Sequence, residues 1–406
     1  MTTCNMEREN YFYLSGLYLM LLRHNIPVIG MALYWVGAFF CFLYLIYGGT
    51  ARRNQAYTKW VLAYVLFFVL SISWSVNWKT SVFVFSFHLI PIFSLTFATL
   101  KYLRDYDRLN NILTAVFFCA LAMLCYLAMN IEEFLIGVRL GNSLNDPDAE
   151  DKIWNANVIG MTFCFALYAG WIVFMNSTSR IRKFFYVIVA VLMTMAVLLT
   201  GSRKTLLMLF IPISYFLYKK ARSKFIISLL GLAVFSALSY YLIMNVEMFY
   251  STIGSRVEDM ITILSGDATG REDDSRYYLT MYGLEWWQDN PILGIGINCY
   301  RVLSNRTSMF WGKGFYAHNN YVELLVDVGI IGTIIYYSGY YYLLKESIII
   351  KSHAASWVFA LLIVVLVLDV AYVSYYDLNN QLLLAILFGV IYLEKNKLLL
   401  RDYEAS

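Results

Sequence analysis

The residues best suited to chemistry in this sequence are a few cations and one histidine near the ends of apolar segments. Arg203 and Lys204 lie in LLTGSRKTLL, Arg276 lies near the start of SRYYLTMYGLEWW, and His318 begins HNNYVELL. Arginine binds phosphate well because its planar guanidinium donates two parallel hydrogen bonds and stays charged. Histidine can take a proton from a hydroxyl near neutral pH. These residue types predict a site that binds a phosphate-bearing anion and activates a hydroxyl.

The composition indicates that membrane-spanning helices position these residues. The chain has 406 residues, of which 60% are hydrophobic and 14% are charged. Soluble chains are roughly half apolar and a quarter charged, so an ordinary cytosolic enzyme is excluded. A net charge of +4 provides no basic surface for a nucleic acid. We predict an all-α polytopic membrane protein that forms a single multi-pass domain over residues 1–406.

Apolar segments long enough to cross a bilayer recur along the chain. A helix needs about 20 apolar residues to span a hydrocarbon core of roughly 30 Å. We predict about twelve transmembrane helices, or about eleven if one of the two short segments, 11–22 and 205–218, does not cross. The predicted spans are 11–22, 26–47, 60–74, 81–100, 109–130, 156–175, 184–200, 205–218, 225–245, 320–343, 355–374 and 380–393.

The charges of alternate loops predict the orientation. Lys and Arg concentrate in cytoplasmic loops, and one alternating set of loops is basic here while the other is acidic or mixed. This pattern places both termini in the cytoplasm and two long loops, 131–155 and 246–319, outside. Loops of this length are usually functional or disordered. The second loop is too aromatic for a disordered linker, so we expect it to carry the catalytic residues. It should contain short helices, one of which starts at Asp273 or Asp274 and stops before Pro291.

Each candidate also has a structural interpretation when it is taken singly. An arginine at a helix end commonly reaches lipid headgroups or pairs with an acid, and a histidine before two asparagines commonly caps a helix. Taken together, the arginines and the only loop histidine fall on one side of the membrane. This favours a site for an anion whose tail stays in lipid, such as a polyprenyl diphosphate. The sequence has no Walker loop, GxSxG elbow or HExxH pair, so we expect neither a metal nor a cofactor.

Three segments resemble the signature blocks of a known family. LLTGSRKTLL, SRYYLTMYGLEWWQDNPILGIG and AHNNYVELLVDVGIIG are similar, in order and placement, to blocks of the O-antigen ligase and O-antigen polymerase superfamily. The acidic loop ending WNANVIG resembles the asparagine block that precedes them in that family. The resemblance implies a GT-C-like glycosyltransferase in the bacterial cytoplasmic (inner) membrane, with its active site facing the periplasm.

The resemblance also implies the reaction and the roles of the candidates. The donor would be a saccharide linked to undecaprenyl diphosphate, and transfer would be metal-independent and inverting. Arg203 and Arg276 would bind the diphosphate as catalytic residues, and His318 would orient or deprotonate the acceptor hydroxyl. The remaining substrate-binding candidates are Arg139, Lys204, Asn319 and Glu323.

We predict a polysaccharide polymerase, and two alternatives stay open: an O-antigen ligase and a secondary transporter. Polymerases join one lipid-linked repeat to another, whereas ligases move the finished glycan to a lipid A core sugar. The motifs are common to both, and the regular HNNYVELLVDVGIIG block favours the polymerase. A secondary transporter also matches the span count, but no internal repeat is evident. The expected partners are the undecaprenyl-diphosphate-linked oligosaccharide, a saccharide or lipid A core acceptor and membrane lipids, with a chain-length regulator as a further candidate.

Overall fold

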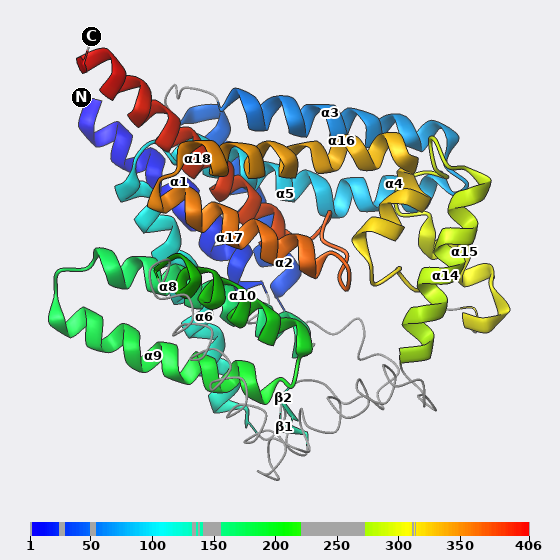
Figure 1. The fold of residues 1–406 in the computed structure, drawn as a ribbon, viewed down its shortest axis with the longest axis horizontal. Helices are drawn as coiled ribbons and strands as arrows, with labels where there is room; N and C mark the ends of the chain where they lie inside the picture. Colours follow the sequence, from blue (N-terminus) through cyan, green and yellow to red (C-terminus); the bar gives the residue numbers. More distant parts are fainter. Residues whose placement is uncertain are drawn as a thin grey trace. The chain divides into compact units, whose positions relative to one another are not determined.

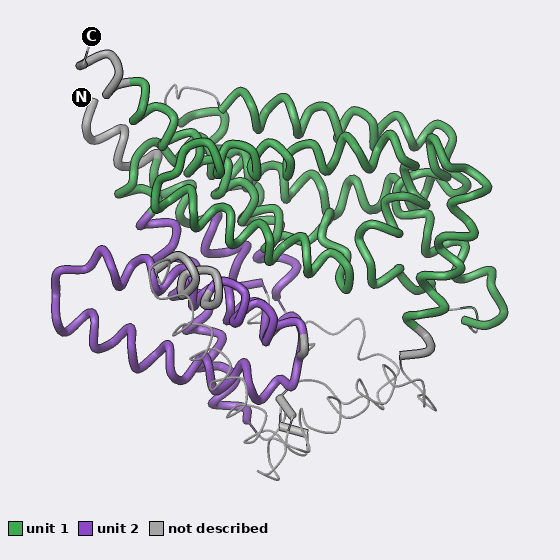
Figure 2. The backbone as a smooth tube through the Cα atoms, viewed as in Figure 1, with its two compact units in different colours: residues 1–16, 35–109, 271–406 green, residues 17–34, 110–270 purple. Residues whose placement is uncertain are grey.

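The computed structural model describes residues 2–23, 29–48, 54–131, 135–136, 139–140, 156–220, 273–310, 312 and 314–405. These residues are almost entirely helical, apart from turns and one short antiparallel pair of strands, β1 (Leu135–Ile136) and β2 (Arg139–Leu140). The chain divides into two compact units (Figure 2). Residues 1–16, 35–109 and 271–406 form unit 1, and residues 17–34 and 110–270 form unit 2.

The helices follow one another with short connections in most of the described chain (Figure 1). Before the strand pair they are α1 (Thr2–Leu22), α2 (Gly30–Tyr47), α3 (Gln55–Ser71), η1 (Ile72–Trp74), α4 (Trp78–Val84), the π-helical turn η2 (Phe85–Leu89), α5 (Ile90–Tyr102) and α6 (Tyr106–Met129). After it they are α8 (Ala156–Asn176), α9 (Arg180–Leu199), α10 (Arg203–Lys220), α14 (Asp273–Asp289), α15 (Tyr300–Arg306), η4 (Ser308–Phe310), α16 (Asn320–Ile350), α17 (His353–Leu368) and α18 (Leu378–Ala405).

The helices agree with a polytopic membrane protein. A helix lies at every predicted span except 225–245, which lies outside the described residues. Within the described chain, seven helical segments are long and apolar enough to cross a membrane. They are Gly30–Tyr47, Gln55–Trp74, Trp78–Tyr102, Tyr106–Met129, Ala156–Asn176, Arg180–Leu199 and Asn320–Ile350. The total of about twelve spans and the GT-C-like arrangement stay predictions.

One predicted boundary is wrong, and tertiary hydrogen bonds explain why. The span predicted to reach residue 374 ends as a helix at Leu368, so Asp369 is the C-cap of α17 and does not lie inside it. The backbone carbonyl of Asp369 accepts a hydrogen bond from Asn320 N at 2.7 Å, and its carboxylate accepts one from the Tyr337 hydroxyl at 2.8 Å. These contacts with α16 hold the chain in a turn where local hydrophobicity alone favours more helix.

In unit 1, α16 packs against α3 and α17, and α5 packs against α18 (Figure 1). Trp60 of α3 stacks on Phe388 of α18 with ring centroids 5.2 Å apart, and its indole N–H donates to Tyr336 O at 2.7 Å. A Cβ at Gly339 of α16 would lie 2.3 Å from the Trp60 ring. The glycine therefore allows α16 to approach the ring, and this contact fixes the helix that follows His318.

A break in α16 fastens the preceding loop to this helix. Gly329 has φ 65° and ψ −172°, which are not helical values. The segment PILGIG bonds to the backbone beside the break: Ile295 N donates to Val326 O at 3.0 Å, and Gly296 N donates to Asp327 O at 2.8 Å. Backbone groups in an apolar layer must be paired within the protein. The loop thus supplies hydrogen bonds that the helix lacks at its break.

Replacing Gly329 by alanine should lower the stability of unit 1 by more than backbone strain alone would, because the new Cβ would also clash with a neighbouring segment. A Cβ at Gly329 would lie 2.3 Å from the Ile292 carbonyl oxygen, and this backbone region, which is essentially restricted to glycine, costs other residues about 1–3 kcal/mol. Gly312 provides a matched control because its φ is 70°, yet the nearest atom to its Cβ would be 3.9 Å away. We expect Gly329→Ala to lower the thermal unfolding midpoint in detergent clearly more than Gly312→Ala. Equal shifts would contradict close packing at the break.

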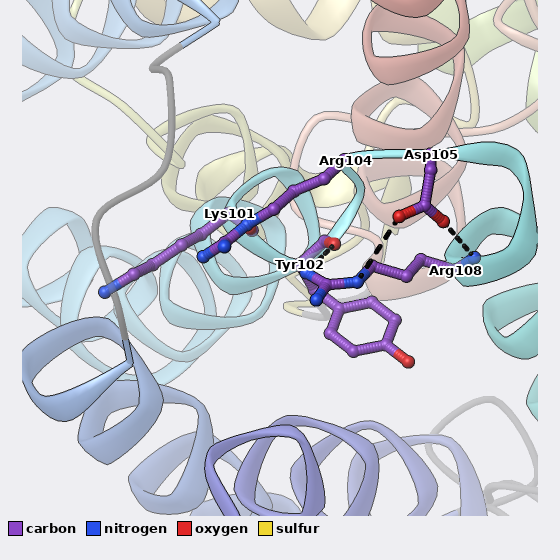
Figure 3. Close-up of polar contacts among 5 residues, drawn as sticks. All are labelled: Lys101, Tyr102, Arg104, Asp105 and Arg108. Atoms are coloured by element: carbon purple, nitrogen blue, oxygen red, sulfur yellow. Dashed lines mark hydrogen bonds and ion pairs between the residues drawn. The ribbon is translucent and has the colours of Figure 1, made fainter. Parts of the chain in front are cut away.

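Basic side chains at the turn between α5 and α6 bind carbonyl groups at helix ends (Figure 3). Lys101 Nζ donates to Leu45 O at 2.8 Å in the last turn of α2, and Arg108 Nη1 donates to Tyr102 O at 3.2 Å at the end of α5. Arg108 Nε also lies 3.6 Å from the Asp105 carboxylate. Cations stabilise helix C-termini, where carbonyl groups lack partners within the helix. Because Lys101 and Arg108 already bind carbonyl groups, we assign them a structural role and not a role in ligand binding.

Candidate active site

In unit 2, the turn between α9 and α10 holds two of the predicted site residues. Arg203 is the first residue of α10, and its side chain lies outside the described part of the structure. Lys204 is buried, with 8% of its surface exposed. The turn is fixed by Thr205 Oγ1, which donates to Ser202 O at 2.8 Å, and by Ser202 Oγ, which donates to Asn157 Oδ1 at 2.7 Å. The TGSRK block and the WNANVIG block therefore meet in the fold.

Arg139 lies in β2, where its backbone is paired with Ile136 of β1. Its side chain and most of the loop 131–155 lie outside the described residues. The role of Arg139 in binding a substrate thus stays a prediction.

In unit 1, the helix predicted to start at Asp273 or Asp274 and to stop before Pro291 is confirmed as α14. The face of α14 that carries Gly283 packs on α16, since a Cβ at Gly283 would lie 2.4 Å from Val322 Cγ1. Arg276 lies near the start of this helix with its side chain exposed. It makes no hydrogen bond or ion pair with any residue that the structure describes. A helix that is fixed by packing on α16 thus carries an exposed guanidinium near its start.

His318 is held in an unusual conformation directly before α16. Its φ is 53°, in the left-handed region that few non-glycine residues adopt, and its ring lies 3.9 Å from the ring of Tyr316 between centroids. Glu323 Oε2 accepts a hydrogen bond from Ala317 N at 2.7 Å. The Asn319 side chain accepts hydrogen bonds from two backbone N–H groups in the first turn of α16, at 3.0 and 3.2 Å. The residues on both sides of His318 are therefore fixed, as expected where strain serves a site.

The first turns of α16 also bind segments that lie before and after it in the sequence. Asn320 Oδ1 accepts a hydrogen bond from Ser374 N at 3.0 Å in the turn after α17. The buried Asp327 carboxylate accepts one from Asn298 N and one from Tyr300 N, each at 2.7 Å. Two segments of the chain thus converge on the first turns of α16, and this convergence makes the surroundings of His318 rigid.

Arg301 is a candidate that the sequence analysis missed. Its Nη2 donates to the Tyr376 hydroxyl at 3.1 Å, and its guanidinium lies over the Tyr316 ring, 5.1 Å from the centroid. Burial alone would lower the pKa of Arg301, but Tyr376 and the Glu323 carboxylate raise it above its ordinary value, so the group stays charged. Arg301 Nε and Glu323 Oε1 are both buried, and neither has a hydrogen-bond partner among the residues that the structure describes. Arg301 therefore supports the Tyr316 ring against which His318 packs.

Replacing Arg301 by an apolar residue should destabilise unit 1, because the buried Glu323 would lose its nearby positive charge. In Arg301→Met the buried Glu323 carboxylate loses its nearby cation, and an uncompensated buried charge is costly. We expect a lower thermal unfolding midpoint in detergent, partly restored when Glu323→Gln is added to the same chain. Arg306→Met, at the exposed end of α15, is the control and should change little. A further loss of stability on adding Glu323→Gln would contradict the electrostatic link.

The structure thus brings part of the predicted set together. Asn319 and Glu323 are close to His318, and α14, which carries Arg276, packs on the helix that follows His318. Arg203 and Lys204 belong to unit 2. Unit 1 alone provides an exposed guanidinium and an imidazole on elements that are fastened to one another, which suits recognition of an anion and proton transfer from a hydroxyl.

Comparison with known proteins supports the resemblance of the motif blocks. Residues 188–337 match the family model described as O-antigen ligase. The matched segment contains all three blocks, whereas Arg139 and the WNANVIG block lie before it. No curated protein matches the chain. The family match supports the interpretation of the blocks: residues 188–337 of this multi-pass membrane protein are similar to the O-antigen ligase family, whose members are glycosyltransferase-like enzymes.

Proposed function

We propose that this protein is a polysaccharide polymerase that joins undecaprenyl-diphosphate-linked oligosaccharide repeats on the outer leaflet of the bacterial inner membrane. The observation that carries the proposal is the assembly at the start of α16. There a strained histidine and a loop helix with an exposed arginine are fastened to one apolar span within the family segment. A site of this kind suits a substrate with a lipid tail, an anionic diphosphate and a sugar acceptor.

In the proposed reaction, the acceptor hydroxyl attacks the anomeric carbon of the donor sugar. His318 takes the hydroxyl proton as the new carbon–oxygen bond forms. The bond between the anomeric carbon and the diphosphate oxygen breaks, and undecaprenyl diphosphate leaves with the electron pair. Arg203 and Arg276 stabilise the charge that develops on this leaving group. Attack opposite to the leaving group inverts the anomeric configuration.

The alternative function is that of a ligase, which is favoured by the description of the matching family model as O-antigen ligase. A ligase would use the same donor and the same leaving group. Its acceptor would be a lipid A core sugar and not a second lipid-linked repeat. The HNNYVELLVDVGIIG block is our reason for placing the polymerase first.

One experiment separates these functions. Purified protein in lipid vesicles is incubated with undecaprenyl diphosphate carrying one oligosaccharide repeat, and the products are separated on a gel. A ladder of products that is absent with Arg276→Ala supports the polymerase. Transfer only after lipid A core is added supports the ligase. Failure of the wild-type protein in both assays would contradict the proposed function.

Chelators should leave the reaction unchanged. The proposed leaving group is neutralised by arginine side chains, so no divalent cation is required for its departure. We expect the initial rate to be the same within error with and without EDTA. Loss of product in EDTA that is restored by one added divalent cation would contradict the metal-independent mechanism.

A further inference from the structure

The face of α14 that points away from α16 forms an open groove. The groove has a volume of about 480 Å³, and its lining includes Tyr277, Tyr278, Met281, Tyr282, Glu285 and Gln288. Three of these side chains are exposed: Tyr277 by 60%, Tyr278 by 38% and Met281 by 47%. An exposed group of large apolar side chains on a fixed element usually marks a binding surface.

The groove belongs to a rigid part of the protein, so its rings cannot easily turn inward. On the opposite face of α14, the Tyr300 hydroxyl donates to Leu279 O at 2.5 Å, and Trp286 packs against the Tyr300 ring with centroids 5.2 Å apart. Gly283 leaves no room for a Cβ against Val322. The buried face is therefore already filled, and the groove is displayed in a fixed conformation, which lowers the entropy cost of binding a ligand.

The side chains of the groove combine two kinds of contact. Tyrosine rings offer apolar faces, while the exposed Glu285 and Gln288 make no hydrogen bond or ion pair with any residue that the structure describes. A sugar has the complementary surface, because its ring presents C–H groups on a face and hydroxyl groups around the edge. Hydrocarbon tails would leave the carboxylate and the amide unpaired, which is unfavourable.

The position of the groove relates it to the proposed donor site. Arg276 directly precedes Tyr277, and Gln288 lies twelve positions after Arg276, or about 18 Å along the helix axis. This inference rests on the proposed function, in which Arg276 binds the diphosphate. We propose that this face of α14 binds the oligosaccharide part of the lipid-linked substrate, with the sugars lying along the helix from Arg276 towards Gln288.

The direct test is equilibrium binding of the oligosaccharide itself. The repeat unit from the surface polysaccharide of the source organism is released from its lipid by mild acid, and its binding to purified protein is measured by calorimetry. The double variant Tyr277→Ala, Gln288→Ala should bind about tenfold more weakly than the wild type, which corresponds to ~1.4 kcal/mol. Tyr341→Ala is the control, because Tyr341 is 67% exposed on α16 and lies outside the groove. Unchanged binding by the double variant would overturn the proposal.

The kinetic test separates this inference from the proposed function. With undecaprenyl diphosphate carrying a full repeat, the double variant should show a KM about tenfold higher and a kcat within about twofold of the wild type. With a donor that carries a single sugar, Gln288→Ala alone should behave like the wild type, because Gln288 lies about 18 Å along the helix from Arg276. If the double variant lost the same fraction of its activity with both donors, the groove would not be the oligosaccharide site. Such a result would indicate a general defect or a face that contacts the membrane. An inactive wild type that still binds the oligosaccharide through Tyr277 and Gln288 would overturn only the proposed reaction.

Discussion

Arg276→Ala should give a protein that inserts into the membrane normally and forms no detectable product. The guanidinium is exposed and has no partner among the described residues, so its removal leaves no buried group unpaired. The loss falls on the leaving diphosphate, where removal of one strong donor typically lowers turnover by about 10²–10³-fold. Arg276→Lys should retain part of the activity, because lysine keeps the charge but not the planar pair of donors. The measurement is the initial rate of product formation by equal amounts of purified protein.

The control for this prediction is Arg306→Ala, another exposed arginine of the same loop, which should retain full activity. Arg203→Ala should behave like Arg276→Ala, because both arginines are proposed to bind the same diphosphate. Normal product formation by both variants would refute the diphosphate site. Loss of protein from the membrane in Arg276→Ala would assign this residue a structural role instead.

His318→Ala should lower turnover strongly, by about 10²–10⁴-fold if the imidazole takes the acceptor proton. The left-handed backbone at His318 complicates this variant, because alanine tolerates φ 53° poorly. His318→Asn addresses this, since asparagine adopts the left-handed region more readily. Both variants should be similarly inactive if the ring performs the chemistry. The measurement is kcat with the lipid-linked repeat at saturating concentration.

His353→Ala serves as the control, because this exposed histidine starts α17 away from the assembly at His318. Full activity of His318→Asn combined with inactivity of His318→Ala would show that only the backbone conformation matters. An unchanged rate in both variants would remove His318 from the mechanism.

Much of the architecture could be predicted from the sequence because long apolar segments and turn residues act locally. The helix from Asp273 to Asp289 was predicted from an acidic start and a proline stop, and it lies where expected. Glycines favour turns locally, and Gly294 and Gly296 of PILGIG have positive φ values of 67° and 107°. These features depend on neighbouring residues, which a single sequence displays.

The features that could not be predicted depend on contacts between distant segments. Nothing in VDVGIIG distinguishes Gly329, where α16 breaks, from a glycine inside a regular span, since the break depends on pairing with residues 291–296. Arg301 was missed for the same reason: its neighbours Tyr316, Glu323 and Tyr376 come from three other places in the chain. The predicted end of the span at 374 was wrong because Asp369 binds residues of α16.

The break at Gly329 has a consequence for biogenesis. Synthesis proceeds from the N-terminus, so residues 291–296 leave the ribosome before residues 326–331, to which they bond. Until the two segments meet, the Val326 and Asp327 carbonyls lack these partners, and unpaired backbone groups cost several kcal/mol in hydrocarbon. We therefore expect α16 to complete its insertion only when the loop has already docked, so that the assembly around His318 matures as the last membrane segments arrive.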